Sequence, residues 1–267
     1  MSTRAAAVAG MFYPRDPQVL DAAISRYLTD ATMALHGSSV ARDAQIKALI
    51  VPHAGYQYSA PIAATAYSRV AAFASRITRV VLLGPAHRVH LRGMAIPTVD
   101  RFEVPGGAID LDQNAIALLK SLPGVVESDL AHRDEHCLEV QLPFLRAVLH
   151  DFKLVPVVVG ACPRERVAAV LEALWGGDET LIVISSDLSH YLPYSQAQAH
   201  DARTSHAIVN RSQVLTGEDA CGAYALNGLM EVARRHDLHV TALDVRNSGD
   251  TAGDKSRVVG YGAYIVS

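Results

Sequence analysis

The sequence predicts an α/β fold over residues 1–267, in one domain with a central mixed, largely parallel sheet between layers of helices. Short apolar runs rich in β-branched residues alternate with longer segments of helical periodicity, which favours this class. Several of the apolar runs also end in polar clusters, as is typical of the carboxyl edge of an open α/β sheet, where ligands bind. No low-complexity linker divides the chain, so we expect a single domain.

The strands are predicted from the apolar runs. Residues 48–51 form a continuously apolar run that stops at Pro52, which lacks the N–H that a sheet ladder requires, so a short buried strand is expected there. The same reasoning predicts further strands at residues 80–83, 93–99, 153–159, 180–185, 240–245 and 258–266.

The helices are predicted where apolar residues recur every three or four positions. Pro61 is expected near the start of its helix, where a missing N–H costs no hydrogen bond. Pro143 predicts a kink or a restart in the helix-like segment that follows residue 136. A polar loop is expected around residues 36–43. The other helices are predicted at residues 17–28, 60–67, 112–122, 164–174, 195–209 and 218–236.

Composition limits the classes of partner. The chain has 24 basic and 27 acidic residues and a formal charge of −3, so it has no basic footprint for nucleic acid. Its apolar stretches are much shorter than the roughly 20 residues that cross a bilayer, and its first residues do not resemble a secretory signal. Three widely spaced cysteines predict free thiols rather than a disulfide framework. We therefore expect a cytoplasmic protein that binds neither nucleic acid nor membrane.

Two histidines that follow predicted strands, His53 and His87, suggest a metal site. Neutral imidazole is the commonest metal ligand, and two imidazoles with one carboxylate form the set typical of non-haem Fe(II). Asp250 or Asp187 could supply the carboxylate. The structural alternatives are hydrogen-bonded histidines without a metal, and a surface turn at residues 247–250.

Asp187 and His190 lie three residues apart after a predicted strand. If the chain turns helical there, they share a face, as a general acid/base and its orienting partner would. Alternatively, Asp187 caps a helix and His190 is solvated. Nearby serines permit a serine nucleophile, but the chain has no GxSxG elbow. Cys221, before a glycine, is predicted to serve in packing rather than in chemistry.

Several motifs occur in a fixed order along the chain. They are Ala9-Gly10-Met11-Phe12-Tyr13-Pro14, Pro52-His53-Ala54-Gly55-Tyr56, Gly84-Pro85-Ala86-His87, Asp134-Glu135-His136, Ser185-Ser186-Asp187-Leu188-Ser189-His190, and Asn247-Ser248-Gly249-Asp250 before Val259-Gly260-Tyr261. Together they closely resemble the MEMO family, whose bacterial and archaeal members are also called AmmeMemoRadiSam system protein B. That family is similar in fold to the LigB-like class III extradiol dioxygenases, which hold Fe(II) with two histidines and a carboxylate.

The resemblance implies roles for individual residues. It makes His53 and His87 the metal ligands and places Asp187 and His190 in the site as catalytic residues. In the related dioxygenases a further histidine acts as acid/base, and His190 takes that part here. Glu135 and His136 are expected either to hold a ligand histidine in one tautomer or to be polar residues at a helix start.

The third ligand is where the chain departs from its relatives. The animal MEMO protein has a metal-binding Cys in the late loop, and alignment backwards from the Val-Gly-Tyr motif places Thr251 there, beside Asp250. We take Asp250 as the ligand, with Ser248 and Thr251 as supporting partners. A carboxylate favours a divalent metal such as Fe(II) or Mn(II) over Cu(I), with copper and zinc as further candidates.

Three functions are consistent with the sequence. The first is a metal-dependent, dioxygenase-like oxidoreductase in which His53, His87 and Asp250 hold Fe(II) and His190 moves a proton. The second is a non-catalytic interaction module that binds a peptide or small-molecule ligand, because fold does not imply function. The third is a hydrolase that uses a metal-bound water.

Overall fold

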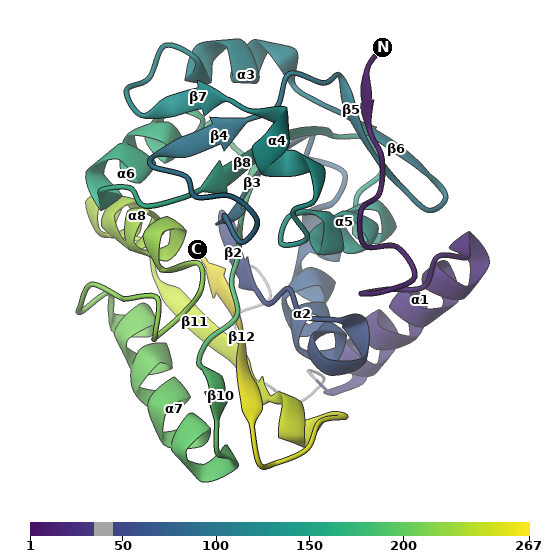
Figure 1. The fold of residues 1–267 in the computed structure, drawn as a ribbon, viewed down its shortest axis with the longest axis vertical. Helices are drawn as coiled ribbons and strands as arrows, with labels where there is room; N and C mark the ends of the chain where they lie inside the picture. Colours follow the sequence, from purple (N-terminus) through teal and green to yellow (C-terminus); the bar gives the residue numbers. More distant parts are fainter. Residues whose placement is uncertain (35–44) are drawn as a thin grey trace.

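The computed structural model describes residues 1–34 and 45–267. The polar loop expected around residues 36–43 therefore lies outside the described residues. The described chain forms an α/β fold in which helices flank a mixed sheet, so the predicted fold class is confirmed (Figure 1). Among the described residues, no helix combines the length and apolar character that a membrane crossing needs.

The main sheet has four parallel strands at its centre, in the order β2-β9-β3-β8. β12 pairs antiparallel with β2 on one side and β4 pairs antiparallel with β8 on the other, while β7 follows β4 and both β10 and β11 pair with β12. Because β2, β9 and β3 are adjacent and parallel, their carboxyl ends meet at one edge. The strands are β2 (Ala48–Val51), β3 (Arg79–Pro85), β4 (Met94–Ile96), β7 (Val125–Glu127), β8 (Lys153–Val159), β9 (Thr180–Ser185), β10 (His190–Leu192), β11 (Val240–Asn247) and β12 (Val258–Val266).

A small second sheet, which the sequence analysis did not predict, joins β1 (Thr3–Arg4), β5 (Arg101–Val104) and β6 (Gly107–Asp110). β5 and β6 form a hairpin in which Val104 pairs with Gly107, so only Pro105 and Gly106 connect the two strands. Gly106 has a φ of +88°, a conformation that favours glycine.

Helices cover both faces of the main sheet. Figure 1 shows α1, α2 and α5 on one side and α6 and α8 on the other, and α7 packs along β11. The helices are α1 (Pro17–Ala34), α2 (Tyr56–Val70), α3 (Gln113–Leu119), α4 (Asp129–Arg133), α5 (Leu142–Val148), α6 (Arg164–Ala173), α7 (Tyr194–Asn210) and α8 (Ala223–Arg235), with 3₁₀ turns at Ala71–Phe73, Glu139–Gln141 and Ser248–Asp250.

Of the two predictions made for prolines, one is confirmed and the other is wrong. Pro143 lies in the first turn of α5, directly after a 3₁₀ turn, so the predicted helix restart is confirmed. The prediction for Pro61 is wrong, because α2 begins at Tyr56 and encloses this proline. The missing N–H leaves the carbonyl of Gln57 without its helical donor, and Gln57 is exposed, so water can take the place of that donor.

Candidate metal centre

Three histidines converge beyond the carboxyl edge of the main sheet. His53 follows β2, His87 follows β3, and His136 lies between α4 and the 3₁₀ turn before α5. The ring centroids are 5.2 Å apart for His53 and His87, 5.4 Å for His53 and His136, and 4.7 Å for His87 and His136. Each ring can offer one nitrogen such that these atoms all lie within 4.8 Å of one another, so together they could hold a metal ion.

Glu135 is the buried carboxylate behind two of these rings. Its Oε1 accepts a hydrogen bond from His87 Nδ1 at 2.9 Å, and its Oε2 accepts one from the backbone N–H of His87 at 2.6 Å. The backbone N–H of His136 also donates to Oε1, at 3.0 Å. His136 Nδ1 lies 3.2 Å from Oε1 but is poorly aligned for a hydrogen bond. The carboxylate therefore fixes His87 and the start of the His136 segment.

The pKa of Glu135 lies well below its usual value. Burial alone would raise this pKa, but the close His136 and His87 rings and the backbone N–H of His87 outweigh that effect. Glu135 is consequently a carboxylate, and His87 Nδ1 donates its proton to it. An acceptor in this position leaves His87 Nε2 as the nitrogen available to a ligand.

His53 is almost completely buried and is held at three atoms. Its backbone N–H donates to Asp187 Oδ1 at 2.7 Å, its Nδ1 lies 3.0 Å from Ser185 Oγ, and its Nε2 lies 3.3 Å from Cys221 Sγ. Burial, followed by the nearby His87 and His136 rings, lowers the pKa of His53 well below its usual value. The ring is therefore neutral near pH 7, as a metal ligand must be.

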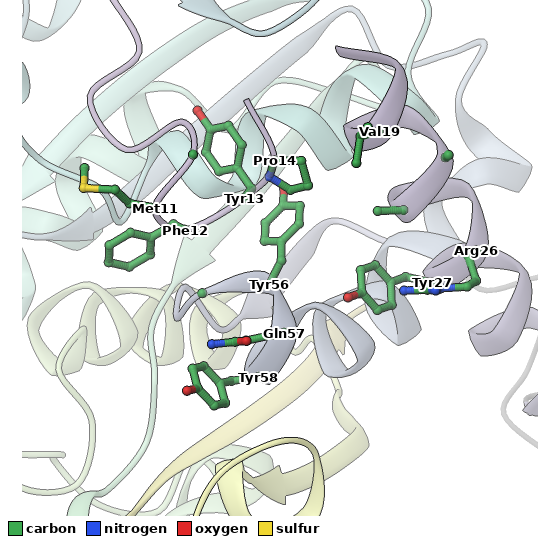
Figure 2. Close-up of a pocket in the computed structure, with 14 residues that line it drawn as sticks. Met11, Phe12, Tyr13, Pro14, Val19, Arg26, Tyr27, Tyr56, Gln57 and Tyr58 are labelled. Atoms are coloured by element: carbon green, nitrogen blue, oxygen red, sulfur yellow. The ribbon is translucent and has the colours of Figure 1, made fainter. Parts of the chain in front are cut away.

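An aromatic groove of about 1000 Å³ adjoins this cluster. Figure 2 shows the rings that line it, which come from the N-terminal segment, α1 and the start of α2: Phe12, Tyr13, Tyr27, Tyr56 and Tyr58. The Phe12 ring centroid is 4.6 Å from that of His136, so Phe12 contacts both the groove and the cluster.

Comparison with known proteins identifies the family. Residues 4–265 match the family model described as Memo-like protein. The chain belongs to the Memo-like protein family. Its relatives include a MEMO1 family protein from Aquifex aeolicus, 33% identical over 277 residues and 98% of both chains, and one from Ignicoccus hospitalis, 35% identical over 281 residues and 98% of both chains.

A solved structure of an uncharacterized protein from Escherichia coli K12 is also similar to this Memo-like chain. It has a TM-score of 0.49 and 16% sequence identity, and the match covers 81% of this chain and 99% of that one.

The structure does not bring Asp250 into the histidine group of this Memo-like protein. The Asp250 carboxylate accepts hydrogen bonds from the backbone N–H of Asn247, at 2.9 Å, and from the Tyr194 hydroxyl, and its residue is exposed. Thr251 Oγ1 donates to the Ser248 carbonyl at 3.2 Å, and Ser248 Oγ accepts from the backbone of Val259 at 3.1 Å. These side chains stabilise the turn at residues 247–251 and its contacts with α7 and β12.

Strand order explains this separation. Asp250 follows β11, whereas His53 follows β2, and β12 lies between those two strands. With a spacing of about 4.8 Å between neighbouring strands, β11 and β2 are about 10 Å apart. The sequence indicates that both residues follow an apolar strand, but it does not indicate which strands are neighbours.

The segment after β9 is extended rather than helical. The carboxylate of Asp187 is buried and accepts from the backbone N–H of His53, while His190 begins β10 and pairs with Val259 of β12. Burial raises the pKa of Asp187, opposed by the hydrogen bond from His53 and by the charge of His190. His190 is half-buried and lies close enough to influence the pKa of both Asp187 and His53.

Cys221, which was predicted to serve in packing, lies against His53 in the structure. Its Sγ lies 3.3 Å from His53 Nε2 and accepts the backbone N–H of Asp187, also at 3.3 Å. Burial, and then the charge of Asp187, raise the pKa of the thiol to about 12. Gly222 provides the only local signal, since a Cβ there would meet Ser186 Cβ at 2.7 Å. A glycine thus permits the close approach that brings this thiol to the cluster.

Proposed function

We propose that the chain binds one transition metal ion through His53, His87 and His136, with Cys221 as a fourth donor. The observation that carries this proposal is the convergence of the three imidazoles, with one nitrogen of each within 4.8 Å of the others. Imidazole and thiolate ligands suit iron, copper and zinc, whereas Mg²⁺ and Ca²⁺ require oxygen. His87 is exposed, so the centre has an open side toward solvent.

The three imidazole nitrogens lie close enough together for one ion, whereas Cys221 Sγ lies close to His53 Nε2 alone and would have to move toward the ion to bind it. In a tetrahedral site with a metal–nitrogen distance of about 2.0 Å and a metal–sulfur distance of about 2.3 Å, the two ligand atoms lie about 3.5 Å apart. The observed distance between His53 Nε2 and Cys221 Sγ, 3.3 Å, is close to this value. Binding would require loss of the thiol proton, and a nearby cation favours the thiolate.

Metal content of single variants tests the proposal. Protein is purified anaerobically without a metal-chelating tag, and its iron, copper, zinc and manganese are measured by mass spectrometry. We expect His53→Ala, His87→Ala and Cys221→Ser each to lower metal affinity at least about 10-fold. Loss of a residue that only supports a ligand already costs about that much, and loss of a ligand should cost more. His136→Ala should weaken binding as well.

Asp250→Ala is the matched control, because the sequence-based expectation of a two-histidine, one-carboxylate site predicts the opposite outcome for it. We expect this variant to keep wild-type metal content, since its carboxylate bonds Tyr194 and Asn247. Loss of metal from Asp250→Ala together with wild-type content in Cys221→Ser would refute the proposed donor set.

We further propose that this centre serves an oxidoreductase related in chemistry to the LigB-like dioxygenases. A bound redox-active ion would supply the activation of O₂ toward a small-molecule substrate. His190 lies near Asp187 and His53 and is half-buried, which suits a residue that moves a proton at the edge of the site. The adjoining aromatic groove gives a small-molecule or peptide ligand a surface to occupy.

His190→Ala separates catalysis from metal binding. We expect the variant to keep its metal but to lose at least about 100-fold in the rate of O₂ consumption with a catechol, the scale of a missing general acid/base. Metal-loaded wild-type protein that consumes no O₂ with any catechol would instead support the non-catalytic or hydrolytic function.

A further inference from the structure

A buried chain of polar side chains lies behind His53. It runs from Tyr67 in α2 through Gln141 in the 3₁₀ turn to Ser185 at the end of β9, and then to His53 Nδ1. Tyr67, Gln141 and Ser185 are each at most 1% exposed, and their side chains form hydrogen bonds with protein groups. The direction of every proton in the chain can therefore be worked out from its partners.

Two fixed partners orient the amide of Gln141. Its Nε2 lies 2.9 Å from the carbonyl of Pro52, which can only accept, so this atom must be the amide nitrogen. Its Oε1 accepts from the Tyr67 hydroxyl at 2.9 Å. The second N–H of the amide consequently donates to Ser185 Oγ, at 2.8 Å.

The proton of Ser185 is also assigned. Ser185 Oγ lies 2.6 Å from the backbone carbonyl of Cys137, another group that can only accept, so the single hydroxyl proton points there. One oxygen lone pair accepts from Gln141. The other faces His53 Nδ1 at 3.0 Å, and a hydrogen bond at that distance requires the proton to be on Nδ1.

We infer that Ser185 is a positioning residue that keeps neutral His53 in its Nδ1–H tautomer, so that the Nε2 lone pair faces Cys221 and the metal position. The consequence for metal binding rests on the proposed function. The assignment of the tautomer itself does not, because it follows from hydrogen bonds between protein groups alone. Ser185 acts on His53 as Glu135 acts on His87, with a neutral hydroxyl in place of a carboxylate.

The tautomer can be measured directly. In metal-free, ¹⁵N-labelled protein at pH 7.5, long-range ¹H–¹⁵N correlation spectra distinguish protonated from unprotonated imidazole nitrogens. We expect wild-type His53 to show a protonated Nδ1 and an unprotonated Nε2. A wild-type spectrum with the proton on Nε2 would overturn the inference, and this result needs no variant to fold.

Ser185→Ala tests the residue that is responsible. Without the hydroxyl acceptor, we expect the Nε2–H tautomer of His53 to become detectable, and metal affinity to fall about 10-fold, as when a supporting partner is lost. Ser189→Ala is the matched control, since Ser189 is equally buried and four residues away, and its hydroxyl is not bonded to His53. An unchanged tautomer in Ser185→Ala would show that Ser185 does not set it.

The two readouts separate this inference from the metal proposal. If wild-type His53 has the expected tautomer and Ser185→Ala changes it, the inference holds even when neither protein binds a metal, and only the proposed function fails. If both proteins bind metal tightly but His53 carries its proton on Nε2 in the metal-free state, the inference fails and the metal centre stands.

Discussion

His132 shows what burial does to a histidine that forms no ion pair with any described residue. Its Nε2 lies 3.0 Å from the carbonyl of Ala95, which can only accept, so Nε2 carries the proton. Its Nδ1 is buried, and no described residue forms a hydrogen bond with it. Burial lowers the pKa of His132 to about 4, partly offset by the Ala95 carbonyl and assisted by the charge of Arg4. Protonation would place a charge on a nitrogen that has no acceptor.

A pH-dependent loss of stability follows from this residue. The pKa in the unfolded chain is about 6.5, so the unfolded state binds the proton first as the pH falls. The contribution of neutral His132 to the free energy of unfolding is fully present above pH 6.5. About 3 kcal/mol of this contribution is lost by pH 4. Other groups titrate too, so the measurement is the difference in unfolding free energy between wild type and His132→Gln at both pH values.

His132→Gln keeps a donor for the Ala95 carbonyl and removes the titration. We therefore expect the variant to lose less stability than the wild type on acidification, by about 3 kcal/mol. Identical pH profiles of the two proteins would mean that His132 has an ordinary pKa in the folded state.

Only some residues of the candidate site could be predicted from the sequence around them. His53 and His87 were predictable, because each directly follows an apolar strand and those strands belong to the parallel centre of the sheet. Cys221 was not predictable, because it is far in sequence from any predicted strand end. Only the folded chain brings it into contact with His53. His136 was expected behind His53 and His87, whereas the structure places its ring beside theirs.

At the scale of elements, one buried carboxylate accepts several of the hydrogen bonds that attach the N-terminal segment next to the site. Glu139 is fully buried and accepts from Arg4 at 2.7 Å, from the backbone N–H groups of Ala7 and Val8 at 2.8 and 2.9 Å, and from the Tyr13 hydroxyl at 2.6 Å. These bonds fix the segment that carries Phe12 against His136.

Glu139→Gln should destabilise the protein strongly. The amide cannot accept from every donor, and Arg4 is left as a buried charge without its counter-ion, a change that typically costs about 3–5 kcal/mol. Chemical denaturation measures the loss, and hydrogen exchange should increase at residues 4–13. Glu165→Gln, which alters an exposed partner of Arg164, should leave the midpoint unchanged. Equal stability of both variants would contradict the structural role of Glu139.

The bounds of a strand were predicted correctly where a continuous apolar run alone determines them. The strands predicted at residues 48–51, 153–159, 180–185 and 258–266 have the observed bounds, because a strand buried on both faces must be apolar throughout. The short strands β1, β5, β6, β7 and β10 have partly exposed, mixed sequences. Pairing partners distant in the chain determine them, and a local pattern does not contain that information.

At the scale of the whole molecule, strands from the two ends of the chain are neighbours in the sheet. β2, near the N-terminus, lies between β12, at the C-terminus, and β9, from the second half of the chain. Nearly all buried apolar residues of the described chain form one cluster, which includes residues from all three strands. A cut in a connecting loop would thus leave each fragment with an exposed apolar strand edge.

We therefore propose that residues 1–267 fold as one domain and predict one cooperative unfolding transition. Fluorescence of the single tryptophan, Trp175, and far-UV circular dichroism should give coincident denaturation curves, because neither half of the sheet is stable without the other. Limited proteolysis should trim the chain or degrade it, without releasing two stable halves of similar size. Halves that resist further digestion, or curves with separate midpoints, would show that the interleaved sheet divides into independent units.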